Sequence, residues 1–174
     1  MTEQSKINNA ANRLTTTLFI IYLIALYWIL LLKLGVRFSY MGSRRTNLIP
    51  FSEHVLLNSQ NILNVIIFVP LGIYLGILFE RWIFAKTLFF VFFVSLIVEV
   101  LQYILRLGAF DVTDIITNTL GGSIGIMILK AIEKVFNNSG KTKKLVNIIA
   151  ATGTIIMILL LVLLKKNMLP IKYH

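Results

Sequence analysis

The sequence predicts an all-α fold, a polytopic membrane helix bundle with five transmembrane helices. The chain is 57% hydrophobic, whereas soluble globular domains contain roughly 45 to 50% apolar residues. Its mean hydropathy is +0.85, and its apolar residues form long runs, each near the about 20 residues that a helix needs to cross the hydrocarbon core. Only helices and closed barrels satisfy their backbone hydrogen bonds there, and unbroken runs favour helices over alternating strands.

The first two predicted spans flank the one long loop of the chain. A polar amino-terminal segment, residues 1–13, leads into the first span, residues 14–34. This run is longer than the apolar core of a signal peptide, about 7 to 15 residues, so we expect the chain to keep it as a helix. The second span, residues 61–79, contains Pro70, which is tolerated at membrane depth where a neighbouring helix satisfies the freed carbonyl.

The third and fourth predicted spans are separated by a short turn. The third, residues 83–105, is rich in aromatic residues. The fourth, residues 115–132, contains Gly121 and Gly125 at the GxxxG spacing that lets helix backbones approach closely. We therefore expect these two glycines to face a neighbouring helix.

The fifth predicted span, residues 145–164, completes one transmembrane domain over residues 14–164 and precedes a basic tail, residues 165–174. Five spans place the two termini on opposite sides of the membrane. Lys and Arg are nearly balanced, with nine on the amino-terminal side and eight on the other. The five lysines in the loop at 130–144 decide the prediction: amino terminus inside and carboxyl terminus outside.

Composition excludes several classes of function. The chain has no Cys, which excludes disulfides and thiol nucleophiles. Its formal net charge is +10, but the basic residues flank apolar runs, where they set topology and meet anionic headgroups. We therefore expect no nucleic acid partner. His54 and His174 are the only histidines, and without an HExxH motif or a nucleophile elbow neither a zinc site nor a Ser-His pair can be assembled.

The few polar residues at membrane depth gather at one membrane face. A charged side chain there costs about 2.5 to 3.5 kcal/mol on insertion scales, so Glu99, about two turns before the end of the third span, needs a partner, a proton or a function. The end of this span and the starts of the second and fourth meet at one face in the five-span topology. We therefore predict a shallow, outward-facing polar pocket. Its candidate residues are Asn61, Asn64, Glu99, Gln102, Arg106, Asp111, Asp114 and Asn118.

Several of these residues also have a structural explanation. Asp114 would suit the N-cap of the fourth helix, where its charge complements the helix dipole. Asn64 and Asn118 would suit interhelical hydrogen bonds. Arg44 and Arg45, in the long loop, are either counter-charges for the acids or solvated interfacial cations.

Ordered motifs in the middle of the chain carry a resemblance. They are Arg45-Thr46-Asn47-Leu48-Ile49-Pro50-Phe51, then Asn61-Ile62-Leu63-Asn64 with Phe68, Pro70 and Gly72, then Glu99 with Gln102, and finally Phe110-Asp111 followed by Asp114, Asn118-Thr119 and Gly121-Gly122. Together they resemble the VanZ-like family of bacterial membrane proteins, over roughly residues 44–125. The resemblance implies a multi-pass protein of the bacterial cell membrane and adds Arg45 and Asn47 to the candidate pocket. It also implies low-level resistance to glycopeptides such as teicoplanin, the property of the family's name-giver.

Two departures from the family pattern affect the site. Members often carry a further acid where this chain has Thr113, and an arginine closer to the first aspartate than Arg106 is. An acidic metal cluster is therefore less suited to this chain, and we expect neither a metal nor a cofactor.

These features lead to one favoured hypothesis and two alternatives. The favoured one is a non-enzymatic membrane protein whose pocket engages a lipid or cell-envelope headgroup and lowers glycopeptide susceptibility. Its expected partners are membrane lipids, with a lipid-linked cell-envelope component or the antibiotic itself as further candidates. The first alternative is a membrane-embedded hydrolase or transferase that acts on a lipid-linked envelope precursor, with Glu99 or Asp111 as general base. The second is a small transporter, although no internal repeat is visible.

Overall fold

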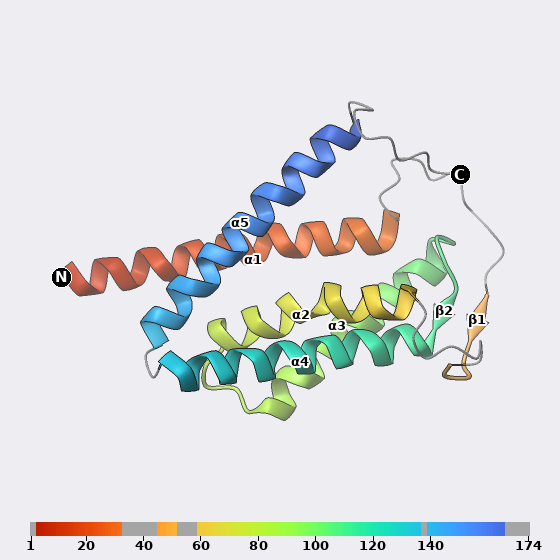
Figure 1. Ribbon diagram of the computed structural model, residues 1–174. Helices are drawn as coiled ribbons and strands as arrows, with labels where there is room; N and C mark the ends of the chain where they lie inside the picture. The colour runs from red at the N-terminus through yellow and green to blue at the C-terminus, as the bar shows by residue number, and fades with distance from the viewer. Residues whose placement is uncertain (1–2, 33–44, 52–58, 137–138, 166–174) are drawn as a thin grey trace.

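A computed structural model describes residues 3–32, 45–51, 59–136 and 139–165 of the protein (Figure 1). These residues form five helices and one pair of two-residue strands, which confirms the predicted all-α class. In chain order the elements are α1 (Glu3–Leu32), β1 (Thr46–Asn47), α2 (Ser59–Leu78), α3 (Phe84–Ile104), β2 (Phe110–Asp111), α4 (Val112–Phe136) and α5 (Ser139–Lys165).

Four of the helices are long and apolar enough to cross a membrane. Their apolar stretches are Ala11–Leu31, Gln60–Leu78, Phe84–Ile104 and Val112–Phe136. The protein is therefore a multi-pass membrane protein. The predicted fifth span, 145–164, lies within α5, which is not among these four, so a five-span topology stays a prediction.

Four helices begin earlier than the hydrophobic runs indicated. Helices α2 and α5 begin at Ser59 and Ser139 rather than at residues 61 and 145. Helix α1 starts at Glu3, because the polar residues ahead of its apolar run include no Pro or Gly and continue the same helix. Helix α4 starts at Val112 rather than at residue 115. Hydrophobicity marks where a helix enters the hydrocarbon, whereas capping decides where its backbone begins.

The helices alternate in direction, so their ends gather at two opposite ends of the bundle (Figure 1). At one end, α1 and α3 finish, α2 and α4 begin, and β1 lies beside β2; we call it the acidic end. At the other, α2 and α4 finish and α3 and α5 begin; we call it the basic end. Helices α2 and α4 consequently run parallel to each other, with α3 as the antiparallel connection between them.

Helices α2 and α4 approach closely along a seam of glycines. A Cβ atom on Gly121 would overlap the carbonyl oxygen of Val65, and one on Gly125 would overlap that of Val69. From the opposite side, a Cβ on Gly72 would overlap the carbonyl oxygen of Gly122. The predicted contact of the GxxxG face with another helix is thus confirmed, and the partner is α2.

Helix α1 packs against α2 and α3 and supplies a hydrogen bond near Pro70. The central core joins α1, α2 and α3 through a cluster of buried side chains. The hydroxyl of Tyr22 in α1 donates to the carbonyl of Ile67 at 2.8 Å. Pro70 cannot donate to the carbonyl of Ile66, and the bond from Tyr22 lies on the next carbonyl along α2. The buried core residues are Leu26, Phe68, Leu71, Leu75, Val91 and Val94.

Helix α5 packs against the first half of α1 through polar contacts. Thr15 and Asn147, 1% and 5% exposed, lie 2.9 Å apart between the hydroxyl and amide oxygens. The Asn147 amide also donates to the carbonyl of Ala11 at 3.3 Å. Buried polar pairs of this kind join helices inside a bilayer, where lipid is as apolar as Leu.

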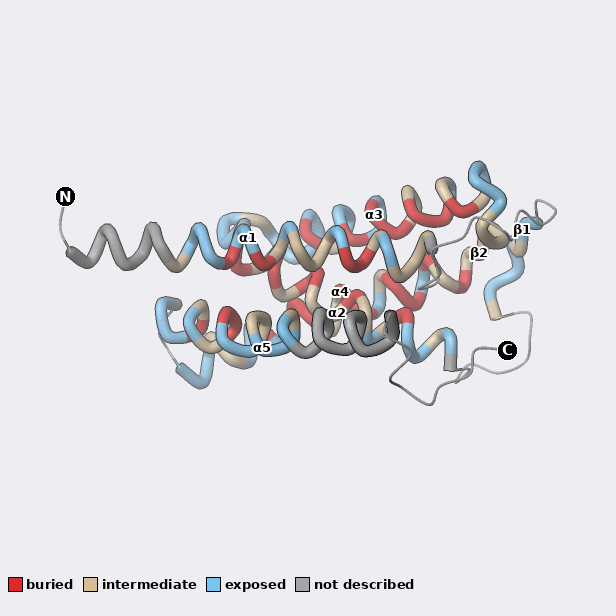
Figure 2. Tube along the Cα trace, turned by 90° about the horizontal axis from the view of Figure 1, so that it is seen from above, coloured by how far each residue is buried: buried red, intermediate tan, exposed pale blue. Residues whose placement is uncertain are grey.

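Large apolar side chains cover the outside of the bundle. Buried residues follow the faces that the helices turn toward one another, and exposed residues follow the outer faces (Figure 2). Phe89 and Phe93 of α3 are 67% and 48% exposed, and Met127 of α4 is 62% exposed. Continuous apolar exposure on this scale is typical of a lipid-facing surface rather than of a soluble monomer.

Candidate functional site

A short parallel strand pair attaches the loop before α2 to the turn between α3 and α4. Thr46 lies opposite Phe110, and Asn47 lies opposite Asp111. The backbone N–H of Phe110 donates to the carbonyl of Arg45 at 3.0 Å. This pairing places the described loop segment, residues 45–51, beside the ends of the spanning helices (Figure 1).

Asp111 is the centre of the hydrogen bonding at the acidic end. Its Oδ1 accepts from the backbone N–H of Thr113 at 2.7 Å, and its Oδ2 accepts from the Asn47 amide at 3.0 Å. Because α4 begins at Val112, the bond from Thr113 is an N-cap bond. The cap of this helix is therefore Asp111, and the interpretation of Asp114 as the N-cap is wrong because the helix starts three residues earlier than its apolar run.

Glu99 lies directly beneath this turn. It is 1% exposed and sits five residues before the end of α3, which places it roughly 8 Å inside the helix end at 1.5 Å per residue. Its Oε2 accepts from the backbone N–H of Asp111 at 3.0 Å. A carboxylate at this depth is costly unless it is hydrogen-bonded, and the turn supplies one donor.

Asp114 lies in the first turn of α4 and is held by α2. Its Oδ1 accepts from the amide of Asn64 at 2.8 Å, and its Oδ2 accepts from the amide of Gln60 at 3.4 Å. Asn61 is half-buried in the first turn of α2. The carboxylate of Asp114 also lies near the positive end of the α4 dipole. Asn64 thus joins two helices and at the same time orients one of the candidate acids.

Two further candidates link helices beside the acids. The Asn118 amide donates to the hydroxyl of Ser95 at 2.9 Å, and its own Oδ1 is the buried side-chain acceptor without a partner in the described part of the chain. The Gln102 amide donates to the carbonyl of Leu30 near the end of α1 at 2.8 Å. Both residues therefore form hydrogen bonds between helices. For Asn118 this is the structural explanation that the sequence suggested.

The two described candidate cations lie at the edge of this network. Arg45 and Arg106 are exposed, and Arg106 forms no ion pair with any described acid. Arg106 has a φ of 57° and ends α3: its N–H bonds the carbonyl of Tyr103, and the next N–H bonds that of Gln102. These are the two bonds of a Schellman C-cap with Arg106 in the left-handed position. Arg44, like His54, lies outside the described residues.

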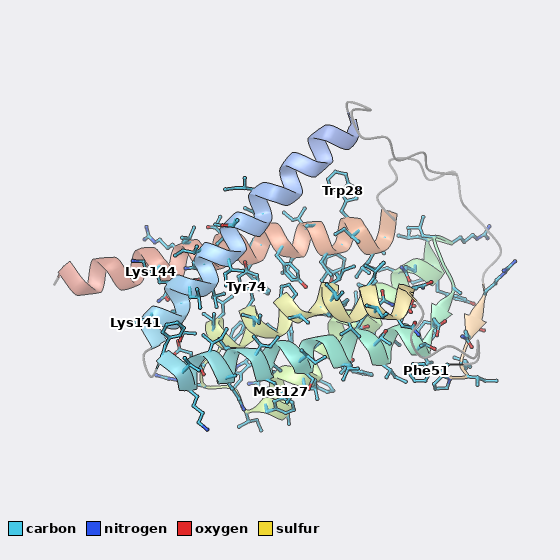
Figure 3. The ribbon with its side chains drawn as sticks, viewed as in Figure 1. Trp28, Phe51, Tyr74, Met127, Lys141 and Lys144 are labelled. Carbon is cyan, nitrogen blue, oxygen red and sulfur yellow. The ribbon has the colours of Figure 1, made fainter. Side chains whose placement is uncertain are left out.

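The sequence prediction omitted two residues that complete the network. Gln60 lies four residues before Asn64, on the same helical face, and that spacing could have identified it. Thr113 is 6% exposed, and its hydroxyl accepts from the backbone N–H of Phe51 at 3.0 Å. This bond holds the carboxyl end of the described loop segment 45–51, where Phe51 lies (Figure 3). No sequence signal indicated it, because Thr is common inside membrane helices.

No group of three metal-ligating side chains occurs in residues 3–32, 45–51, 59–136 and 139–165. Glu99, Asp111 and Asp114, which we call the acidic cluster, direct their oxygens toward amide donors instead. The candidates thus form one network around Asp111, with Glu99 and Asn47, and a second around Asp114, with Asn64. A cavity of about 530 Å³ lies elsewhere, at the basic end.

Comparison with known proteins assigns the chain to a family. The model of the VanZ/LLP1 family matches residues 19–137, and the chain is 37% identical over 153 residues to Protein VanZ of Enterococcus faecium, covering 86% of this chain and 91% of that protein. The chain belongs to the VanZ/LLP1 family. No solved structure matches it.

The part that matches the VanZ/LLP1 family contains the whole candidate site. Every candidate residue, from Arg45 to Asn118, falls within residues 19–137, whereas α5 lies beyond them. The recognition of a VanZ-like protein from its motifs is confirmed. The site therefore belongs to the part of the fold that defines the VanZ/LLP1 family.

Proposed function

We propose that this protein lowers susceptibility to glycopeptide antibiotics such as teicoplanin, without catalysis, by engaging a lipid or cell-envelope headgroup at the acidic end. Membership of the VanZ/LLP1 family and 37% identity to Protein VanZ support the link to glycopeptide resistance. The acidic end faces outward in this proposal, with five spans, the amino terminus inside and the carboxyl terminus outside.

The observation that carries the proposal is the burial of Glu99 under a paired loop. Its side chain is 1% exposed, and it accepts a hydrogen bond from a backbone N–H of the turn. An intramembrane carboxylate is expensive and therefore indicates function. The acidic cluster has three carboxylates at one end of the bundle, which suits a headgroup that presents ammonium or hydroxyl donors.

The enzymatic alternative needs an acid that is available to take a proton. Both oxygens of Asp111 already accept hydrogen bonds, from Thr113 and from Asn47. Both oxygens of Asp114 accept as well, from Asn64 and Gln60. These bonds occupy and position both oxygens of each aspartate, which argues against either one as a general base.

The test is the teicoplanin susceptibility of a strain that lacks the gene, complemented by wild type, Glu99→Gln, Asp111→Asn or Asp114→Asn. We expect each variant to reach the membrane at a normal level and to fail to restore resistance. Glu133→Gln is the matched control, because it removes an acid from the far half of α4. The proposal is contradicted if all three variants are well expressed and restore resistance as well as the wild type does. If none of the three variants accumulates in the membrane, the acidic cluster serves only to stabilise the fold.

A further inference from the structure

The cavity at the basic end lies at the boundary of the apolar spans. Its volume is about 530 Å³, within the range of roughly 300 to 1,000 Å³ of small-ligand sites. Its walls come from the start of the α1 span, the end of α2, the turn before α3 and the first turns of α5. These segments mark where the apolar stretches begin and end, so the cavity opens at headgroup depth. It is lined by Asn12, Thr16, Ile77, Leu78, Phe79, Glu80, Arg81, Trp82 and Lys143.

The charges in this cavity leave an excess of one cation. Lys143 of α5 donates to the Glu80 carboxylate at 2.7 Å and to the Asn12 side-chain oxygen at 3.1 Å. Glu80 is thereby neutralised and Lys143 is fixed in place. Arg81, the next residue, is exposed and forms no ion pair with a described acid. Its guanidinium is thus available to bind an oxyanion.

More positive charge lies at the same end of the bundle. Lys141 and Lys144 lie in the first turns of α5, at this end of the bundle (Figure 3). Helix α5 itself begins at Ser139, so the positive end of its dipole also lies here. The charged residues at this end of the bundle are thus mainly basic, opposite in sign to the acidic cluster.

The other half of the cavity is apolar and aromatic. Ile77, Leu78 and Phe79 end the α2 span. The rings of Phe79 and Trp82 stack with their centroids 4.3 Å apart. Aromatic rings of this kind are enriched at the membrane interface, where one edge contacts acyl chains and the other contacts headgroups. A ligand of this cavity should therefore combine an anionic head with an apolar body.

We propose that the basic-end cavity binds an anionic phospholipid, with its phosphate on Arg81 and Lys143 and its acyl chains over Phe79 and Trp82. Asn12 and Thr16 supply hydrogen-bonding groups for the rest of the headgroup. Basic pockets between spanning helices are suited to such headgroups. The headgroup would join α1, the α2–α3 turn and α5. This site is separate from the acidic end and does not depend on the resistance function.

The experiment measures lipid binding to the purified full-length protein in detergent by native mass spectrometry. We expect phosphatidylglycerol to bind more tightly than phosphatidylcholine. Arg81→Gln should weaken phosphatidylglycerol binding about fivefold, the effect of removing one basic residue at an anionic surface, and Arg81→Lys should restore most of it. Arg81 lies in an exposed turn, so these changes should leave the fold intact.

Lys134→Gln is the matched control, since it removes one cation at the same end but outside the cavity. It should change the affinity less than twofold. If Arg81→Gln and Lys134→Gln lose phosphatidylglycerol affinity equally, the lipid is bound by general surface charge rather than by the cavity, and the proposal is overturned. Equal binding of the two lipids would also overturn it. Displacement of the lipid by millimolar inorganic phosphate alone would identify a free-phosphate site instead.

Discussion

Asp111 combines two functions that can be separated by substitution. As the N-cap it accepts from Thr113, and its other carboxylate oxygen accepts from Asn47. Asn is as good an N-cap as Asp, whereas Ala is not. Any effect of the cap and any effect of the charge can therefore be measured independently.

We predict that Asp111→Ala lowers the unfolding free energy by about 1 kcal/mol, the usual cost of a lost N-cap. Asp111→Asn should cost only a few tenths, because its amide oxygen still accepts from Thr113 and the Asn47 amide can flip to pair with it. Thermal unfolding in detergent measures the difference. Similar losses in both variants would mean that the charge, rather than the cap, holds the turn.

Arg106 occupies a backbone conformation that favours glycine. Its φ of 57° is left-handed, which costs a residue with a Cβ atom about 1 to 2 kcal/mol. We predict that Arg106→Gly raises the unfolding free energy by about 1 kcal/mol. Leu105→Gly is the control: Leu105 has a φ of −79°, so glycine there should destabilise. A less stable Arg106→Gly protein would show that the guanidinium makes a contact that outweighs the strain.

The sequence could identify single residues whose burial in the membrane costs free energy. It could not identify residues whose role depends on which backbone groups lie beside them in the folded protein. Glu99 was identifiable because an acid inside an apolar run needs a reason. The capping function of Asp111 was not, because it requires the true start of α4. The bond from Gln102 to the Leu30 carbonyl likewise depends on which helix passes alongside, and no local pattern encodes that.

At the scale of elements, the glycine seam between α2 and α4 has the least tolerance for added volume. We predict that Gly121→Ala lowers stability by about 1 to 3 kcal/mol, the usual cost of overpacking, because its Cβ would overlap the Val65 carbonyl oxygen. In Gly153→Ala the Cβ meets nothing within 4 Å, so this variant should be neutral or slightly more stable. Detergent unfolding of both variants provides the measurement, and equal tolerance would contradict the seam.

The elements differ in how readily their sequence reveals them. All five helices were predictable because each contains an apolar run of about 20 residues, and the glycine spacing at 121 and 125 indicated a packed face. The strand pair was not predictable. β1 and β2 have two residues each, too few for an alternating pattern, and they join segments 64 residues apart in the chain.

At the scale of the whole molecule, the feature to test is the orientation of the protein in the membrane. In the proposed topology the loop between α4 and α5 lies in the cytoplasm with the basic-end cavity, as its lysines favour. We predict that a reporter fused after Lys144 behaves as cytoplasmic and one fused after His174 behaves as external. Reporters on the same side would exclude five spans. A reversed pair would keep five spans but place the acidic cluster inside the cell.

The parallel pairing of α2 and α4 also has a consequence for biosynthesis. Helix α2 ends at Leu78, and Gly125, which meets its backbone at Val69, is made 47 residues later. At translation rates of roughly 5 to 20 residues per second, α2 waits about 2 to 9 seconds in the bilayer before this partner exists. During that interval its Gly72 face has only lipid to contact. A ribosome that stalls within α3 would therefore release a fragment whose most closely packed surface is bare, and that fragment would be an early substrate for membrane proteases.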